Sequence, residues 1–163
     1  MRAWRIVPAR RGGTGFRGER APPHGGPFNS PGTAVVYVSA HQSLAALELL
    51  VHIVHHLPLR CVVFPVEWED LPEERLRPEE LPPDWRSEPA TADIMRLGDA
   101  WVRRGRTALL RVPSVVVPEE DNLLLNPAHP GFARLRVGEA RPFSFDPRLW
   151  VTAGGPAPRQ RRV

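Results

Sequence analysis

The hydrophobic positions of this chain fall into short runs separated by long polar stretches. Residues 3–7 and 34–39 are rich in β-branched and aromatic side chains and predict two strands. Between them, residues 8–33 hold most of the early Gly and Pro and predict a long loop. A nearly continuous apolar run at 59–66 predicts a third, buried strand. Every run is shorter than the roughly 18 apolar residues that a membrane span needs.

Two segments, 44–56 and 92–104, have helical periodicity and predict the two helices. The predicted apolar stripe of the first helix consists of Leu47, Leu50, Val51 and Val54. Glu48 falls on another face of that helix. Residues 67–89 are acidic and rich in Pro, and predict an exposed excursion.

The C-terminal third alternates between strand-like and polar segments. Residues 106–117 predict a strand that is interrupted at Pro113, and residues 118–131 predict a polar loop with a short turn. Residues 134–137 and 142–145 predict two final strands. Short strands mixed with two helices, without regular βαβ alternation, predict an α+β fold with a mixed sheet and flanking helices.

The length of 163 residues fits one compact domain, expected at residues 1–150, with a disordered Arg-, Pro- and Gly-rich tail at 151–163. One cysteine, Cys61, cannot form an internal disulfide, and no signal peptide is evident at the N-terminus. These features predict a cytoplasmic protein.

The composition changes the chemistry that can be expected, because all 22 basic residues are Arg. The absence of Lys excludes Schiff-base catalysis and a P-loop lysine, but Arg binds phosphate well. Residues 1–20 hold six Arg and one Glu, and three more Arg lie in 159–162. The remainder has more acids than bases, so we expect no sequence-specific nucleic-acid binding by the folded body. Non-specific nucleic-acid contact through the basic ends stays an alternative.

Three residues are candidates for chemistry, and each also has a purely structural interpretation. Glu48 lies in an apolar stretch of helix; periodicity alone favours a surface residue that pairs with His52. Tyr37 is either a half-buried aromatic residue of a sheet or a platform on which a planar ring stacks. Ser114 has no Gly-x-Ser-x-Gly surroundings, so we interpret it as a hydrogen-bonding residue and not as a nucleophile.

Other polar residues favour structural roles. Asn122, Asn126 and His129 occur in the sequence NLLLNPAHP, which is typical of turns. The histidines of the first helix lack a His-Glu-x-x-His arrangement and an evident third ligand. We therefore expect no metal site.

Two segments, 29–53 and 112–132, resemble the RES-domain family of bacterial toxins, which is named for an Arg, a Glu and a Ser. The resemblance supplies Glu48 and Ser114, and the Asn-Pro-x-His-Pro pattern strengthens it. Family members have Gly-Gly-Arg-Trp-Asn where this chain has Gly25 to Asn29. Here Pro27 replaces the family Arg and Phe28 replaces the Trp.

The resemblance implies an ADP-ribosyltransferase-like fold and NAD as substrate, with no further cofactor. Members break the bond between nicotinamide and ribose and transfer the remainder to phosphate, water or a protein. Glu48 would stabilise positive charge on the ribose, and Ser114 would position that Glu or the acceptor. Tyr37 would hold the nicotinamide ring, and Arg5 would bind the pyrophosphate.

Further NAD contacts are expected from the Gly-rich loop and the turn that follows it. Asn29 matches the family Asn, and Phe28 stands at the aromatic position before it. Arg17 and Arg20 are candidates to replace the family Arg that is absent at Pro27.

The resemblance also implies a partner, a cognate Xre-like DNA-binding antitoxin, and a homodimer within a larger toxin–antitoxin complex is one expected assembly. One alternative remains open within the family. A RES domain weakened by Pro27 could serve as a partner-binding module without turnover.

Overall fold

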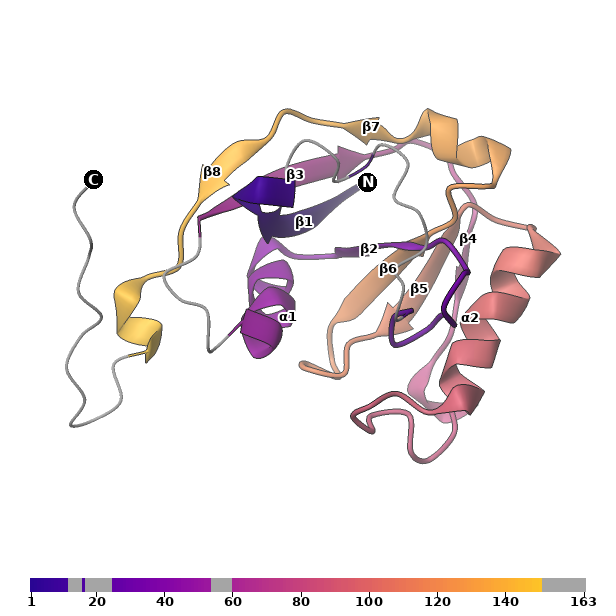
Figure 1. Ribbon diagram of the computed structural model, residues 1–163. Coiled ribbons are helices and arrows are strands. Elements are labelled where there is room, and N and C mark those ends of the chain that lie inside the picture. The colour runs from indigo at the N-terminus through magenta and orange to yellow at the C-terminus, as the bar shows by residue number, and fades with distance from the viewer. Residues whose placement is uncertain (12–15, 17–24, 54–59, 151–163) are drawn as a thin grey trace.

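The computed structural model describes residues 1–11, 16, 25–53 and 60–150, which form one twisted mixed sheet with a helix against each of its two halves (Figure 1). The strands are β1 (Arg2–Pro8), β2 (Val36–Ser39), β3 (Cys61–Glu67), β4 (Glu73–Arg75), β5 (Leu109–Pro113), β6 (Asp121–Leu125), β7 (Arg136–Val137) and β8 (Arg141–Phe143). The helices are α1 (Gln42–Ile53) and α2 (Ala92–Arg104), and short 3-10 turns lie at Ala9–Arg11, Pro78–Glu80, Pro130–Arg134 and Pro147–Trp150. The predicted α+β class is confirmed.

The strand order is β4-β5-β6-β2-β1-β3-β7, and β8 pairs with β3 beside this path. Only β4 and β5 pair in parallel among the described strands; the other pairs are antiparallel. Strands β1 and β3 pair along their full length, and β2 joins this half of the sheet to the β5–β6 hairpin. The strand β2 and the helix that follows it therefore lie where the two halves meet.

The register of β2 decides which residues share a face of the sheet. Ser39 is paired with Asn122 of β6 and with Trp4 of β1, and Tyr37 is paired with Leu124. Because side chains alternate along a strand, these five residues lie on the same face. This is the face that the two helices cover, since Trp4 packs with the α1 cluster and Tyr37 with the α2 cluster.

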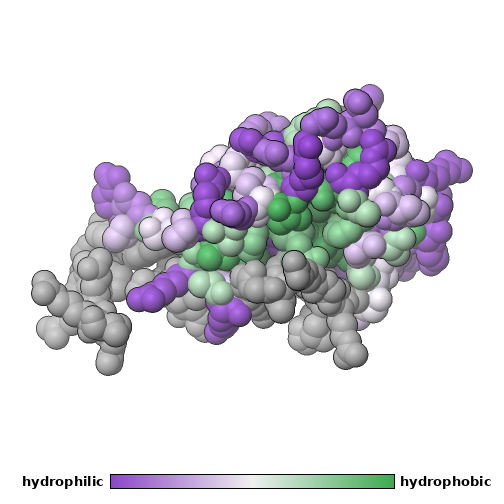
Figure 2. Space-filling view, turned by 90° about the horizontal axis from the view of Figure 1, so that it is seen from above, coloured by the Kyte–Doolittle hydropathy of each residue, from purple (hydrophilic) through white to green (hydrophobic). Residues whose placement is uncertain are grey.

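The core has three parts. Beneath α1 it consists of Ile6, Ala45, Cys61, Val63 and Phe145. Beneath α2 it consists of Phe28, Val35, Leu81, Ile94, Trp101, Leu110, Val112 and Leu124. The opposite face of the sheet carries a third cluster that includes Ala3, Val36, Val38, Val66, Trp68, Leu109, Leu123 and Leu125. Viewed from above, hydrophobic residues gather in the middle of the surface and hydrophilic residues lie towards its edges (Figure 2).

The second helix has the predicted bounds. Trp101 is fully buried, and its indole N–H donates to Thr107 Oγ1 at 3.0 Å. Gly105 ends the helix with a φ of 55°, a left-handed conformation that favours glycine. Gly98 is also required, because a Cβ there would lie 1.7 Å from the carbonyl oxygen of Phe28. The turn that carries Phe28 is thus packed directly against α2.

Two of the predicted loops are wrong. Residues 118–131 contain β6, which lies inside the sheet, and Leu123, Leu124 and Leu125 are buried. The excursion at 67–89 contains β4 and the buried Trp68, Leu71 and Leu81. In the first segment the polar flanks concealed a short apolar run, and in the second the buried apolar residues are isolated among acidic and Pro residues.

The predicted apolar stripe of α1 is wrong in part, since Leu50 does pack against the core. Leu47 and Val51 are 40% and 53% exposed, whereas Leu44 and Ala45 are buried. Val54 lies outside the described residues. The helix packs on the core through Ala45, Ala46, Leu49 and Leu50. Leu44 is fully buried, so the side of the helix that carries Glu48 also turns towards the sheet. No helix in the described part of the chain is long and apolar enough to cross a membrane.

Candidate active site

Glu48 lies in the middle of α1 and meets the far end of the β5–β6 hairpin. Its Oε1 accepts a hydrogen bond from Ser114 Oγ at 2.7 Å and another from Asn122 Nδ2 at 2.5 Å. The two donors lie 66 and 74 residues further along the chain. The fold therefore brings two polar side chains from distant parts of the chain to one carboxylate.

The position of Glu48 follows from the packing of the helix. Leu44, one turn earlier, is fully buried, and the neighbouring Ala45 belongs to the core beneath α1. Residues four apart lie on the same side of a helix, so burying Leu44 directs Glu48 towards the sheet. The structure does not place Glu48 in an ion pair with His52, which is exposed. The structural interpretation of Glu48 as a surface residue is thus replaced by a half-buried position.

Ser114 follows β5 and has no exposed surface. Its Oγ accepts hydrogen bonds from the backbone N–H groups of Val116 and Val117, at 3.0 and 2.9 Å. A hydroxyl has one proton to donate, and here that proton goes to Glu48. This geometry suits the predicted positioning role of Ser114.

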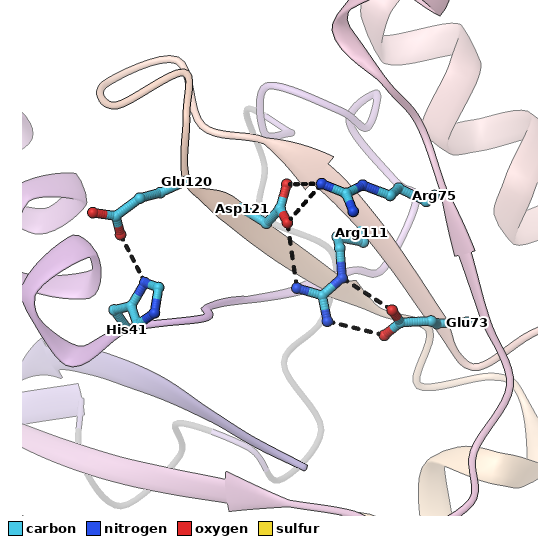
Figure 3. Close-up of polar contacts among 6 residues, drawn as sticks. All are labelled: His41, Glu73, Arg75, Arg111, Glu120 and Asp121. Carbon is cyan, nitrogen blue, oxygen red and sulfur yellow. Dashed lines mark hydrogen bonds and ion pairs between the residues drawn. The ribbon is translucent and has the colours of Figure 1, made fainter.

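Two contacts hold the loop between Ser114 and Glu120 in place. The backbone N–H of Ser114 donates to the carbonyl of Glu120 at 2.9 Å. The carboxylate of Glu120 contacts His41 Nδ1 at 2.9 Å, just before α1 begins (Figure 3). The loop and the start of the helix are therefore tied together beside Glu48.

A second cluster surrounds Tyr37. Its Oη donates to Asn29 Oδ1 at 2.6 Å and accepts from the backbone N–H of Phe28 at 3.0 Å. Burial raises the pKa of the Tyr37 phenol above its ordinary value. A Cβ on Gly26 would lie 2.7 Å from this hydroxyl, so glycine permits the close approach of the turn. Tyr37, Phe28 and Asn29 are thus brought together, and the stacking role of Tyr37 stays a prediction.

The turn at 26–29 contains the substituted family position. Asn29 N–H donates to the carbonyl of Gly26 at 3.3 Å, which makes Pro27 and Phe28 the central residues of a tight turn, and Gly26 N–H donates back to the carbonyl of Asn29 at 2.9 Å. Pro27 is exposed, and its ring suits the first central position of such a turn. Phe28 is only 2% exposed and belongs to the core beneath α2. A side chain at position 27 therefore projects to the surface, whereas the one at 28 packs inside.

The structure does not bring Arg5 onto the face of Glu48. Trp4 is the register partner of Ser39 and faces α1, so the next residue of β1 faces the opposite side. There the Arg5 guanidinium lies 5.3 Å from the centre of the Phe16 ring. Arg17 and Arg20, the candidates from the Gly-rich loop, lie outside the described residues.

A charged network occupies the other face of the same hairpin (Figure 3). Arg111 of β5 donates to both carboxylate oxygens of Glu73, at 3.0 and 3.2 Å, and to Asp121 at 3.4 Å. Arg75 donates to Asp121 at 3.1 and 3.3 Å. The hydrogen bonds that Arg111 donates to Glu73 are the main cause that raises the pKa of the Arg111 guanidinium. Two carboxylates and two guanidinium groups neutralise one another here.

Sequence reasoning missed the contribution of Asn122 and Ser39. Asn122 was expected in a turn, but it lies in β6, and its Oδ1 accepts from Ser39 Oγ at 2.7 Å. The short apolar run Leu123–Leu125 was a signal for a buried strand. The polar residues before it and the Asn-Pro turn after it obscured that signal.

Candidate metal ligands are few in the described residues. No group of three or more His, Cys, Asp or Glu side chains there could hold a metal ion. His52 is exposed on α1, and His55 and His56 lie outside the described residues. The arrangement instead offers a carboxylate, a hydroxyl and an amide in contact, which suits the binding and polarising of an organic substrate.

The fold has a known counterpart among solved structures. A chain of the crystal structure of the M. tuberculosis MbcT–MbcA toxin–antitoxin complex matches with a TM-score of 0.70. The match covers 88% of this chain and 84% of that chain, at 17% sequence identity. At this identity the likeness shows a shared fold.

The sequence comparisons define the family. The RES domain model matches residues 2–146. A protein named Toxin Res from Yersinia enterocolitica serotype O:8 / biotype 1B is 40% identical over 151 residues, which are 91% of this chain and 99% of the relative. The Prs ADP-ribosylating toxin of Sphingobium sp. strain YBL2 is 41% identical over 129 residues, or 77% of this chain and 80% of the relative. The chain belongs to the RES domain family.

Proposed function

We propose that this protein is the toxin of a bacterial toxin–antitoxin system and that it consumes NAD by cleaving the bond between nicotinamide and ribose. Relatives named Toxin Res and Prs ADP-ribosylating toxin support the proposal. The observation that carries it is the 2.7 Å hydrogen bond from Ser114 to Glu48. It joins two residues that match the family's Ser and Glu and that are distant in sequence.

The proposed reaction breaks the glycosidic bond at C1′ of the nicotinamide ribose. The bonding electrons leave with the nicotinamide, which becomes neutral, and C1′ acquires oxocarbenium character. The carboxylate of Glu48 lies among uncharged donors, so its negative charge is available to stabilise that positive charge. An acceptor oxygen or nitrogen then bonds to C1′ and loses its proton.

The other proposed contacts are to the two ends of the dinucleotide. Tyr37 would lie beside the nicotinamide, and it shares the helix-covered face of the sheet with Ser39, which is two residues nearer to Glu48. Arg5 would bind the pyrophosphate, together with Arg20, Phe28 and Asn29 in contact with other parts of NAD. The position of Arg5 on the opposite face of β1 makes its role the first of these to test.

The substitution at Pro27 bears on affinity. A hydrogen bond to a charged group contributes about 1.5–3 kcal/mol, so losing one at a pyrophosphate costs roughly ten- to a hundredfold in binding. The exposed turn at position 27 has room for a longer side chain. We therefore propose that this protein is an active enzyme that binds NAD less tightly than a relative with the Arg.

The deciding experiment measures NAD loss by the purified protein, with and without added phosphate, beside a Glu48→Gln variant. Loss that phosphate stimulates identifies a phosphorylase. Loss that is independent of phosphate identifies hydrolysis or transfer to a protein, which mass spectrometry of the products separates. Equal NAD loss by wild type and Glu48→Gln would contradict the proposed role of the carboxylate.

The proposed partner is an antitoxin that carries DNA recognition itself. The solved complex with the same fold is a toxin–antitoxin pair, which supports a protein partner. The test is co-expression with the product of an adjacent gene, followed by isolation of a stable complex. Tight complex formation by a protein that never consumes NAD would favour the alternative of a partner-binding module.

A further inference from the structure

Asn122 links the carboxylate of Glu48 to the interior of the sheet. It lies in β6 and is the register partner of Ser39 on β2 and of Val112 on β5. Its amide nitrogen donates to Glu48 at 2.5 Å, and its amide oxygen accepts from Ser39 at 2.7 Å. A buried hydroxyl, an amide and a carboxylate therefore form a chain of hydrogen bonds from β2 to α1.

The chain has only one consistent direction. An ionised carboxylate has no proton to donate, so it must meet the NH₂ end of the Asn122 amide. The hydroxyl of Ser39, which is 4% exposed, then donates to the remaining amide oxygen. If the amide turned over, its oxygen would face the oxygen of Glu48 and that contact would become repulsive, whereas the Ser39 hydroxyl could accept from the NH₂ group. The carboxylate therefore sets the direction of the amide, and the hydrogen bond from Ser39 holds the amide in that orientation.

We propose that Asn122 is a positioning residue for the reaction of Glu48 and that Ser39 orients it. This inference rests on the proposed NAD-cleaving function. Within the described part of the chain, both hydrogen bonds to Glu48 end on Oε1. The second oxygen, Oε2, is then the one presented to the ribose.

The kind of donor matters as much as its place. Asn122 and Ser114 are uncharged, so they restrain the carboxylate without cancelling its charge. A guanidinium in either place would restrain it equally well but would neutralise it, as Arg111 and Arg75 do for Asp121. A restrained but uncancelled negative charge is what an oxocarbenium-like transition state requires.

The expected effects follow from the hydrogen bonds lost. A bond to a charged group contributes about 1.5–3 kcal/mol, so Asn122→Ala should lower kcat by roughly ten- to a hundredfold. Because Asn122 holds Glu48 and not the substrate, KM for NAD should change by no more than about threefold. Ser39→Ala removes a neutral bond and should lower kcat by only about two- to tenfold.

The chain supplies a matched control in Asn126. It is an Asn just after β6 and is 1% exposed, whereas Asn122 is partly buried; its amide contacts the backbone of Val102 and Ala128. Asn126→Ala should lower the melting temperature but leave kcat unchanged. If Asn122→Ala lowered kcat no more than Asn126→Ala does, with both proteins folded, the positioning role would be overturned.

A second readout does not depend on turnover. In ¹⁵N-labelled protein the side-chain amide signals of Asn122 should move strongly in Glu48→Gln and in Ser39→Ala, while those of Asn126 stay in place. If the chemical shifts of the Asn122 amide did not change in Glu48→Gln, the contact between the two side chains would be refuted. Wild type that consumes no NAD would instead overturn the proposed function, and the amide signals would still decide whether Asn122 holds the carboxylate.

Discussion

Two carboxylates lie on opposite faces of the β5–β6 hairpin, and their surroundings differ in kind. Glu48 accepts hydrogen bonds from a serine hydroxyl and an asparagine amide. Asp121 accepts from the guanidinium groups of Arg75 and Arg111. The charge of Glu48 is not neutralised by its donors and can act on a ligand. The charge of Asp121 is neutralised by ion pairs that link three strands.

The comparison shows why position in an α+β fold is not enough to identify a site. Both carboxylates are partly buried and hydrogen-bonded, and both join segments far apart in sequence. The charge of the hydrogen-bond donors separates them, because the donors to Glu48 are neutral and those to Asp121 are cationic. In an Arg-rich chain without Lys, a carboxylate that accepts hydrogen bonds from neutral donors alone is a better candidate for a functional site than one paired with Arg.

The largest expected difference between the two carboxylates is in turnover. Glu48→Gln preserves shape and removes the charge, so we expect NAD consumption to fall by about a thousandfold or more, on the order of 4 kcal/mol of transition-state stabilisation. The matched change on the other face, Asp121→Asn, should leave kcat within about threefold of wild type. Steady-state kinetics of both variants check this, and equal losses would remove the distinction drawn between the two carboxylates.

The next effect comes from adding a cation to the turn before Glu48. Pro27→Arg restores the family residue at an exposed turn position, and we expect NAD turnover at low substrate concentration to rise by roughly ten- to a hundredfold. The measured quantity is kcat/KM. Pro27→Leu is the control, because it removes the ring without adding charge. A gain in both variants would mean that the turn's flexibility, and not the guanidinium, limits the enzyme.

The sequence predicted the fold class, the bounds of α2 and most of the strands, because these depend on local apolar patterns. It did not predict that α1 would present Glu48 to the sheet. That orientation depends on Leu44 and Ala45 packing against β1, although Leu47 and Val51 offer more apolar surface. Tertiary packing overrode the local pattern in part, because Leu47 and Val51 of the predicted stripe are exposed while Leu50 packs against the core.

The candidate site likewise contains residues that the sequence predicted and residues that it did not. Resemblance to the family supplied Glu48 and Ser114, and the structure joins them. Asn122 and Ser39 could not be predicted, because their contact requires the register between β2 and β6, which are separated by more than eighty residues. Register is set by long-range pairing, and no local pattern records it.

A smaller effect, on stability alone, is expected from the charged face. Arg111→Met keeps the length of the side chain but leaves Glu73 without its bidentate partner and Asp121 with Arg75 only. We expect the free energy of unfolding to fall by about 1–3 kcal/mol, since these groups are partly shielded from water. Urea denaturation measures it. An unchanged stability together with a large loss of kcat would contradict the purely structural role of this charged network and would indicate that the active site lies on this face.

The smallest effect concerns a third carboxylate, Asp99 of α2. Like Glu48 it accepts a hydrogen bond from a neutral donor, and like Asp121 it has a guanidinium, that of Arg103, nearby. Its Oδ1 accepts from the backbone N–H of Ser30 at 3.0 Å and so holds the segment that follows the Pro27 turn. Desolvation opposes the charged form, but the hydrogen bonds from Ser30 prevail and hold the pKa of the Asp99 carboxyl below its usual range. The stabilisation is therefore fully present above the unfolded-state pKa of about 3.9, and it is lost as the pH falls through the lower folded-state value. As the pH falls below about 4, the melting temperature of wild type should fall more than that of Asp99→Asn, with Asp93→Asn as an exposed control on the same helix. Parallel melting curves for wild type and Asp99→Asn would show that this carboxylate, unlike Asp121, contributes nothing to holding the fold.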